Sequence, residues 1–263
     1  MGQIFEKGKP VIGMLHLPAL PGSPRNELSK DAIRHHILKD AEALASGGVD
    51  GMILENFGDV PFYPGRVPAH TVAFMTAIAV EVRRAFDLPL GINVLRNDAE
   101  SALAIAFAAG AQFIRVNIHS GVRVTDQGLI EGTAHETLRY RKLLGSEVKI
   151  LADADSKHSS ALGTHNLKDE VEDLIGRACA DAIVITGRAT GKPTAIADLK
   201  AAKEAAGAVS VFVGSGVGVS DAAEVLKIAD GLIVGTAFKF DGVTNHAVDP
   251  ERVRNFVAAC RIH

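Results

Sequence analysis

The chain has 263 residues, a formal net charge of −3, and a hydrophobic fraction of 47% of which few residues are aromatic. This length is typical of one (β/α)8 barrel and requires no second domain. The small net charge and the absence of a long Lys/Arg run argue against nucleic acid as a partner, because such binding depends on a basic face that neutralises phosphates. No apolar run reaches the roughly 20 residues of a membrane-spanning helix, so we expect no transmembrane segment.

The two cysteines, Cys179 and Cys260, do not form a metal-type pair, which favours a reducing compartment. The first apolar run begins at Val11 and is interrupted by His16 and Pro18, unlike the core of a signal peptide. We therefore expect a cytoplasmic protein.

Eight times along the chain, a short apolar run is followed by a polar or glycine-rich loop and an amphipathic stretch. This alternation is typical of βα units in a parallel sheet. The predicted strands are Val11–His16, Val49–Glu55, Pro89–Val94, Gln112–Asn117, Val148–Asp153, Asp181–Thr186, Val209–Val213 and Gly231–Val234. Helix starts are indicated by Ser29, by Asn97 with Glu100, by Ser220 with Asp221, and by Asp249-Pro250-Glu251. The sequence thus predicts one domain over residues 1–263, a single (β/α)8 TIM barrel of the α/β class.

Polar residues end several of these strands. Active-site residues of such barrels lie at the C-terminal ends of strands, and side-chain alternation indicates which of them point inward. Arg115 should point inward because the apolar Ile114 and Val116 flank it. The same reasoning lines the barrel mouth with His16, Glu55, Asn93, Arg115, Asn117 and Asp153. Such a cluster must be paired and hydrogen-bonded, so Arg115 could simply neutralise one of the two acids.

The two carboxylates are the first catalytic candidates. We expect Asp153, with Glu55 opposite, to supply proton transfer, because both lie at the last position of a strand, where a ligand can reach them. Burial raises the pKa of a carboxyl group and a nearby arginine lowers it, so an Arg115 paired with only one acid would separate the two values. His16 is a weaker candidate. His16, Glu55 and Asp153 could also bind a divalent ion, although no HxH or HxxE spacing supports this alternative.

Two glycine-led turns, Gly214-Ser215-Gly216-Val217 and Gly235-Thr236-Ala237, follow the last two strands. In a (β/α)8 barrel the loops after strands seven and eight form the usual phosphate site, and amides without side-chain bulk can approach phosphate oxygens closely. The glycines could instead only close tight turns. The expected fold is similar to the ribulose-phosphate-binding barrels. The expected substrate or phosphate contacts are Asn93, Arg115, Asn117, Thr186, Gly187, Gly214, Ser215, Gly216, Gly235 and Thr236, and the turn from Thr186 to Gly191 could extend the anion site.

Two long loops carry further candidates. Thr125–Gly132 and Asp155–Gly163 bear glycines and should be adjacent in the barrel, so we expect them to close over the mouth and exclude water. Lys157 and His158 are candidate acid/base or anion-binding groups, although such a pair on an exposed loop could be merely solvated. No predicted strand ends in lysine, which disfavours a Schiff-base aldolase.

Segments spread over nearly the whole chain resemble the BtpA/SgcQ family. They are His16–Pro24, Glu55–Phe62, Gly91–Asp98, Arg115–Asn117, Thr125–Gly132, Lys157-His158, Thr186-Gly187, Gly214–Val217, and Gly235-Thr236 with Lys239. The best-known members of this family are named photosystem I biogenesis proteins. The resemblance therefore implies a role in assembly or stability of a membrane photosystem, with some members loosely membrane-associated. Other members occur beside sugar-utilisation genes in organisms that do not photosynthesise.

Two functions stay open. The first is an enzyme that acts on a phosphorylated small metabolite, such as a phosphosugar, by acid/base chemistry, as an isomerase, epimerase or lyase. The second is a non-enzymatic, peripherally membrane-associated factor for biogenesis of a photosystem I-type complex, with the barrel as a scaffold. A polar mouth beside a phosphate site favours the first. We also expect a homo-oligomer.

Overall fold

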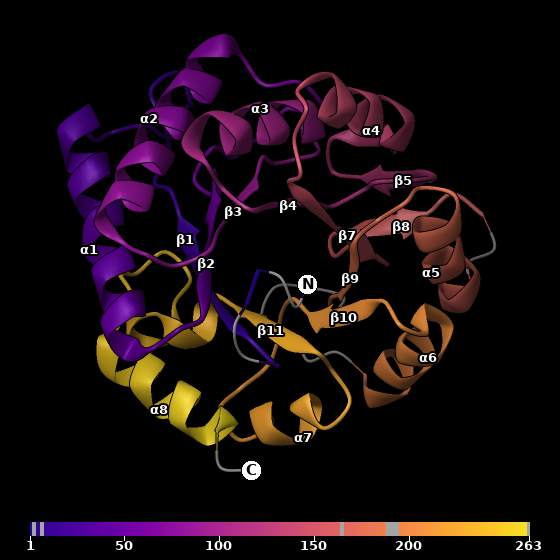
Figure 1. The fold of residues 1–263 in the computed structure, drawn as a ribbon. Coiled ribbons are helices and arrows are strands. Elements are labelled where there is room, and N and C mark those ends of the chain that lie inside the picture. Colours follow the sequence, from indigo (N-terminus) through magenta and orange to yellow (C-terminus); the bar gives the residue numbers. More distant parts are fainter. Residues whose placement is uncertain (2–3, 6–7, 164–165, 188–194, 262–263) are drawn as a thin grey trace.

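The computed structural model describes residues 1, 4–5, 8–163, 166–187 and 195–261. Eight parallel strands close into a barrel in the order β1-β11-β10-β9-β7-β4-β3-β2, with helices around its outside (Figure 1). The strands are β1 (Val11–His16), β2 (Gly51–Glu55), β3 (Leu90–Asn93), β4 (Phe113–Val116), β7 (Lys149–Ala154), β9 (Ala182–Ile185), β10 (Ser210–Val213) and β11 (Gly231–Val234). The predicted TIM barrel is confirmed, and each predicted strand lies within about two residues of the observed one.

The helices follow the strands as expected. They are α1 (Lys30–Gly47), α2 (Ala69–Ala85), α3 (Ala99–Ala109), α4 (Ala134–Leu143), α5 (Leu167–Gly176), α6 (Ile196–Ala206), α7 (Ala222–Leu226) and α8 (Pro250–Cys260). The side chains of Ser29 and Asp249 cap α1 and α8 as predicted. The cap of α3 is Asp98, which accepts from the Ser101 amide, and not Asn97. In the part of the chain that the structure describes, no helix is long and apolar enough to cross a membrane.

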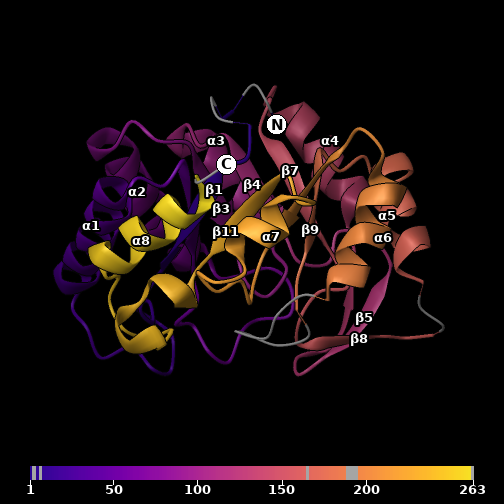
Figure 2. The ribbon, with the colours of Figure 1, turned by 90° about the horizontal axis from the view of Figure 1, so that it is seen from below.

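Alternating strand residues build two separate apolar cores. Outward-pointing residues such as Leu54 and Ile114 pack between the sheet and the helices. Inward-pointing residues fill the barrel: Ile12, Met14, Ile53, Phe113, Leu151, Ala182, Val184, Phe212 and Ile233, with Phe5. The Phe5 ring packs edge-on against Phe113 with 5.9 Å between centroids. In Figure 2 the N-terminal segment lies at the opposite end from the small sheet of β5 and β8. The barrel is therefore closed by apolar side chains at its N-terminal end, which leaves the C-terminal end for polar groups.

The small sheet was not predicted as strands. The chain after β4 forms the hairpin β5 (Val122–Thr125) and β6 (Gly128–Glu131), and β8 (Ser159–Ala161) pairs antiparallel with β5. Both loops expected to cover the mouth thus belong to one three-stranded sheet. Buried Arg123 ties the sheet together, since its guanidinium donates to Ser159 Oγ at 3.0 Å and pairs with Asp155.

Two buried asparagines join successive loops at the mouth. Asn56 donates to the Leu95 carbonyl and accepts from the Leu95 amide, at 3.2 and 2.7 Å. Asn97 makes the same exchange with Ile118, at 2.8 Å in both directions. Each side chain thereby mimics the paired hydrogen bonds of neighbouring backbones. The loops after β2, β3 and β4 are consequently tied to one another.

A buried ion pair anchors the segment that follows β11. Lys239 lies between the 3-10 helices η1 (Thr236–Phe238) and η2 (Phe240–Gly242). Its Nζ is 2.8 Å from Asp40 Oδ2 on α1, and both side chains are only 1% exposed. The other Asp40 oxygen accepts from the Val248 amide at 2.8 Å. Asp40 therefore holds both ends of the segment from Lys239 to Val248, and Thr244 of this segment is hydrogen-bonded to Thr236 at 2.9 Å.

The substitution Lys239→Met should lower the free energy of unfolding by about 3–5 kcal/mol, because Asp40 would stay buried without its cation. Urea denaturation followed by circular dichroism measures this loss. Lys168→Met is the matched control, since Lys168 and Glu204 are also 2.8 Å apart but lie in solvent. Its cost should stay below about 1 kcal/mol. Equal losses in the two variants would contradict the assignment.

Candidate active site

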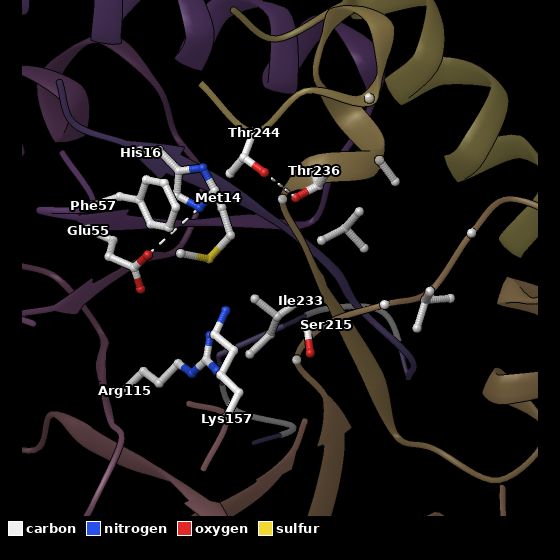
Figure 3. Close-up of a pocket in the computed structure, with 18 residues that line it drawn as sticks. Met14, His16, Glu55, Phe57, Arg115, Lys157, Ser215, Ile233, Thr236 and Thr244 are labelled. Atoms are coloured by element: carbon white, nitrogen blue, oxygen red, sulfur yellow. Dashed lines mark hydrogen bonds and ion pairs between the residues drawn. The ribbon is translucent and has the colours of Figure 1, made fainter. Parts of the chain in front are cut away.

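Residues from both halves of the barrel line one cavity of about 210 Å³ at the C-terminal end of the strands. In Figure 3, His16, Phe57 and Glu55 lie on one side of it, with Arg115 and Lys157 below. The loops 214–218 and 235–237 form the facing wall. The expected phosphate loops and four of the expected polar groups, His16, Glu55, Arg115 and Lys157, are thus brought together.

Arg115 and Asp153 form a bidentate ion pair inside the barrel. Arg115 Nε and Nη2 donate to Asp153 Oδ1 and Oδ2 at 2.8 and 3.0 Å. Asn117 Nδ2 donates to Oδ2 as well, at 2.9 Å, and Asn93 donates to Asn117 Oδ1 at 3.1 Å. Such charge-assisted, two-pronged bonds fix both orientation and charge. Asp153 is therefore fully engaged, and it is not among the residues that line the cavity.

Glu55 is the carboxylate that faces the cavity. Burial raises the pKa of its carboxyl group, with opposing contributions from Lys157 and then Arg115. Within the described chain no lysine or arginine forms an ion pair with Glu55, and His16 Nε2 lies 3.7 Å from its Oε1. Arg115 pairs with one acid only, and that acid is Asp153. Glu55 is therefore the carboxyl group of this cavity whose protonated form burial favours.

His16 and Lys157 are both disposed toward their uncharged forms. Burial lowers the pKa of His16 well below 6.5, and Lys239 and Lys157 lower it further. The imidazole stacks on Phe57 with 4.5 Å between centroids, and its buried Nδ1 has no hydrogen-bond partner among the described residues. Burial and Arg115 likewise lower the pKa of Lys157. His16 is therefore a neutral imidazole beside Glu55 at neutral pH.

The glycine loops present free backbone amides. The N–H groups of Ser215, Gly216, Val217, Thr236 and Ala237 donate to no acceptor within the described residues. Gly216 adopts φ 73°, which favours glycine. A Cβ at Gly214 would lie 2.5 Å from Val184, and one at Gly235 would lie 2.9 Å from the His16 ring. These glycines therefore do more than close turns, since they let the backbone approach the inner face of the barrel.

The remaining predicted residues lie around this cavity. Thr186 Oγ1 donates to the Asp155 carbonyl at 3.4 Å, and the Gly187 amide donates to Ser215 Oγ at 3.1 Å, so both support the loops from outside the cavity. The stretch from 188 to 191 lies outside the described residues. His158 is exposed. The described residues contain no group of three or more His, Cys, Asp or Glu able to hold a metal ion, so His16, Glu55 and Asp153 do not assemble the ligand set considered above.

A second cavity of about 490 Å³ adjoins the first and was not predicted. Glu55, Phe57 and Lys157 line both cavities. Buried Arg96 also lines the second cavity, and its Nη2 donates to the Lys157 carbonyl at 2.6 Å. The sequence could have indicated Arg96 as a residue of the mouth, because it lies just beyond the end of β3, where polar side chains reach the mouth.

Comparisons with other sequences identify relatives along the whole barrel. The sequence model of the BtpA family matches residues 7–261. The photosystem I biogenesis protein BtpA of Synechocystis sp. is 49% identical over 98% of this chain and 90% of that protein. An uncharacterized protein of Thermococcus kodakarensis is 46% identical over 96% of this chain and 95% of its own length. An uncharacterized mitochondrial protein of Caenorhabditis elegans is 32% identical over 98% of this chain and 95% of its own length.

Solved structures share the fold at low sequence identity. Thiamine phosphate pyrophosphorylase from Pyrococcus furiosus superposes with a TM-score of 0.58, 13% identity and 96% coverage of both chains. N-(5'-phosphoribosyl)anthranilate isomerase from the same organism superposes with a TM-score of 0.55 and 15% identity, over 96% of this chain and 98% of that chain. An archaeal fructose 1,6-bisphosphate aldolase superposes with a TM-score of 0.58 and 15% identity, over 98% of this chain and 96% of that chain. This likeness shows the TIM-barrel fold.

The buried His16 should make stability depend on pH. Its folded pKa is lowered, so the folded state binds fewer protons than the unfolded state, and the stabilisation present above about pH 6.5 is lost as the pH falls. Relative to His16→Gln, the wild type should lose up to about 1.4 kcal/mol of unfolding free energy per pH unit below that value. Denaturant unfolding across this range measures the difference.

The control is His35→Gln, an exposed histidine on α1. Its curve should run parallel to that of the wild type. The groups that act on His16 are unchanged in all three proteins: Glu55, Lys157, Lys239, Arg115 and the Thr244 backbone, which raises its pKa. Parallel curves for the wild type and His16→Gln would refute the shift.

Proposed function

The chain belongs to the BtpA family, and from that premise and the geometry of the barrel mouth we propose that it is an enzyme. Its substrate is a phosphorylated small metabolite, and its reaction is an isomerisation, epimerisation or lyase cleavage driven by proton transfer. One observation carries the proposal: the free amides of two glycine loops line the same cavity as a buried carboxyl group of raised pKa.

The amides would bind the phosphate. Backbone N–H groups that donate to no other acceptor can donate to phosphate oxygens, and without a bulky side chain they can approach the anion closely. Lys157 lines the same cavity and adds a cation when protonated. Three similar barrels have names that include phosphorylated compounds, which agrees with this use of the fold. The proposed anion site consists of the loops 214–218 and 235–237.

Glu55 and Lys157 would move the proton. Burial raises the pKa of Glu55 and lowers that of Lys157, so the two values approach each other. Groups whose pKa lies near the working pH give and take protons most effectively. One group removes a proton from the substrate and the other returns one, which leaves the proton count unchanged. Neutral His16 contacts Glu55 and orients it, while Asp153 acts indirectly by holding Arg115 in place.

A role in assembly of a membrane complex is the second candidate. It draws on the name of the Synechocystis relative. It also draws on Val124 and Leu129, which lie opposite each other on the β5–β6 hairpin and are 40% and 58% exposed. Recovery of the wild type with membranes, lost in a Val124→Ser/Leu129→Ser variant, would favour this role. The wide spread of relatives, which includes a nematode, favours the enzyme instead.

The substitution Thr236→Asp should weaken binding of inorganic phosphate at least about tenfold, since a carboxylate within a few ångströms of the anion repels it. Isothermal titration calorimetry measures the affinity. Ser220→Asp adds the same charge at an exposed position outside the cavity and should change the affinity less than about twofold. The anion site is assigned wrongly if the two variants bind phosphate alike.

The substitution Glu55→Gln should lower turnover by about 100-fold or more, the usual share of general acid/base catalysis, and leave phosphate affinity within about threefold. The substrate is first sought with a thermal-shift screen of phosphorylated metabolites. The control is Glu131→Gln, an exposed carboxylate on β6. A folded Glu55→Gln variant with wild-type turnover would remove Glu55 from the mechanism.

Asp153→Asn separates proton transfer from positioning. Loss of the charge that neutralises buried Arg115 should cost about 3–5 kcal/mol of unfolding free energy, a loss that Glu55→Gln should not show. An Asp153→Asn variant of wild-type stability but reduced turnover would instead return proton transfer to Asp153.

A further inference from the structure

The second cavity is more than twice as large as the first, at about 490 Å³ against about 210 Å³. The first cavity holds the proposed phosphate loops together with Glu55 and Lys157. A substrate made only of a phosphate and a short carbon chain would leave the second cavity unused. The mouth therefore has room for a larger group beyond Glu55.

One wall of the second cavity is apolar. Phe57, Val60 and Phe62 come from a single segment after β2, and Leu95 completes the wall from the loop after β3. The rings of Phe57 and Phe62 are only partly buried, unlike the core phenylalanines Phe113 and Phe212. Half-buried rings that face a cavity gain most when a flat apolar group stacks on them.

The opposite chemistry comes from Arg96. Arg96 is 4% exposed, and no carboxylate among the described residues lies within ion-pair distance of it. Glu55 and Asp126, which line the same cavity, and Asp153 attract its charge only from farther away. Its Nη2 is fixed by the Lys157 carbonyl and Ser156 Oγ, at 2.6 and 3.4 Å. A buried guanidinium without a carboxylate partner is costly unless a ligand supplies acceptors. Its planar face and remaining N–H groups suit a flat group that carries oxygen or nitrogen acceptors.

Three residues join the two cavities. Phe57 is held in place by its stacking on His16, while Glu55 and Lys157 lie where the cavities meet. We propose that the substrate is a sugar phosphate that carries a planar, conjugated ring with hydrogen-bond acceptors, the ring lying between Phe62 and Arg96. This inference rests on the proposed phosphate site. The atoms that join sugar and ring then lie beside Glu55 and Lys157, where the proton is transferred.

Binding measurements on the intact chain test the ring subsite. The probes are ribose 5-phosphate and the nucleotides 5'-AMP and 5'-UMP, which add a purine or a pyrimidine to the same sugar phosphate. At least one nucleotide should bind about tenfold more tightly than ribose 5-phosphate, because stacking and acceptor contacts add to the phosphate contacts. Phe62→Ala should abolish this advantage and leave the affinity for ribose 5-phosphate unchanged.

The matched control is Phe107→Ala, an exposed phenylalanine on α3 that lines neither cavity. It should keep the nucleotide advantage. If ribose 5-phosphate binds but neither nucleotide binds more tightly, or if the advantage survives Phe62→Ala, the ring subsite is refuted and the phosphate site stands. If none of the three probes binds, the proposed function itself fails.

Discussion

The ion pair between Arg115 and Asp153 fixes the arrangement of charges at the barrel mouth. Two charges inside a barrel are tolerated only when each satisfies the other in good geometry, and here two parallel hydrogen bonds and a third from Asn117 do so. Because Arg115 is committed to Asp153, Glu55 remains without a cationic partner of its own. The same pair restricts the loop after β10, since a Cβ at Gly214 would lie 3.2 Å from Arg115 Nη2.

This arrangement gives two carboxylates at equivalent strand ends different surroundings. Both lie at the last inward position of a strand, and the sequence alone treats them alike. Asp153 has a fixed partner and does not reach the cavity, whereas Glu55 is buried against neutral His16. Environment and not residue type therefore distinguishes the two acids, as in other sites with paired carboxylates.

The barrel itself could be predicted because its signal is local. Alternation of side chains within each strand correctly placed Glu55, Asn93, Arg115 and Asp153 on the inner face, and the glycine turns after the last two strands line one cavity. The sequence does not identify the partner of Arg115, because alternation along a strand indicates which way a side chain points and not which neighbour it contacts.

Contacts between distant segments could not be predicted. Lys239 and Asp40 are 199 residues apart in the chain, and the second cavity combines loops from four strands. The β5–β6 hairpin, in contrast, has a local sequence signal. Val122 and Val124 alternate with polar residues, and a turn precedes Gly128. The sequence predicts a lid there, whereas the pairing with β8 depends on partners 34 to 38 residues away.

The reciprocal bonds of Asn56 and Asn97 have a thermodynamic consequence. Aspartate lacks the donor and glutamine is one methylene longer, so neither reproduces the exchange. Hydrogen bonds therefore join the loops after β2 and β3 to each other and to Ile118, directly after β4, and the apolar wall of the second cavity belongs to the loops after β2 and β3. A wall ordered before a ligand arrives costs little conformational entropy when the ligand binds. Adjustment to ligands of different size is then expected on the side of β5, β6 and β8, while discrimination by shape rests with the prearranged side.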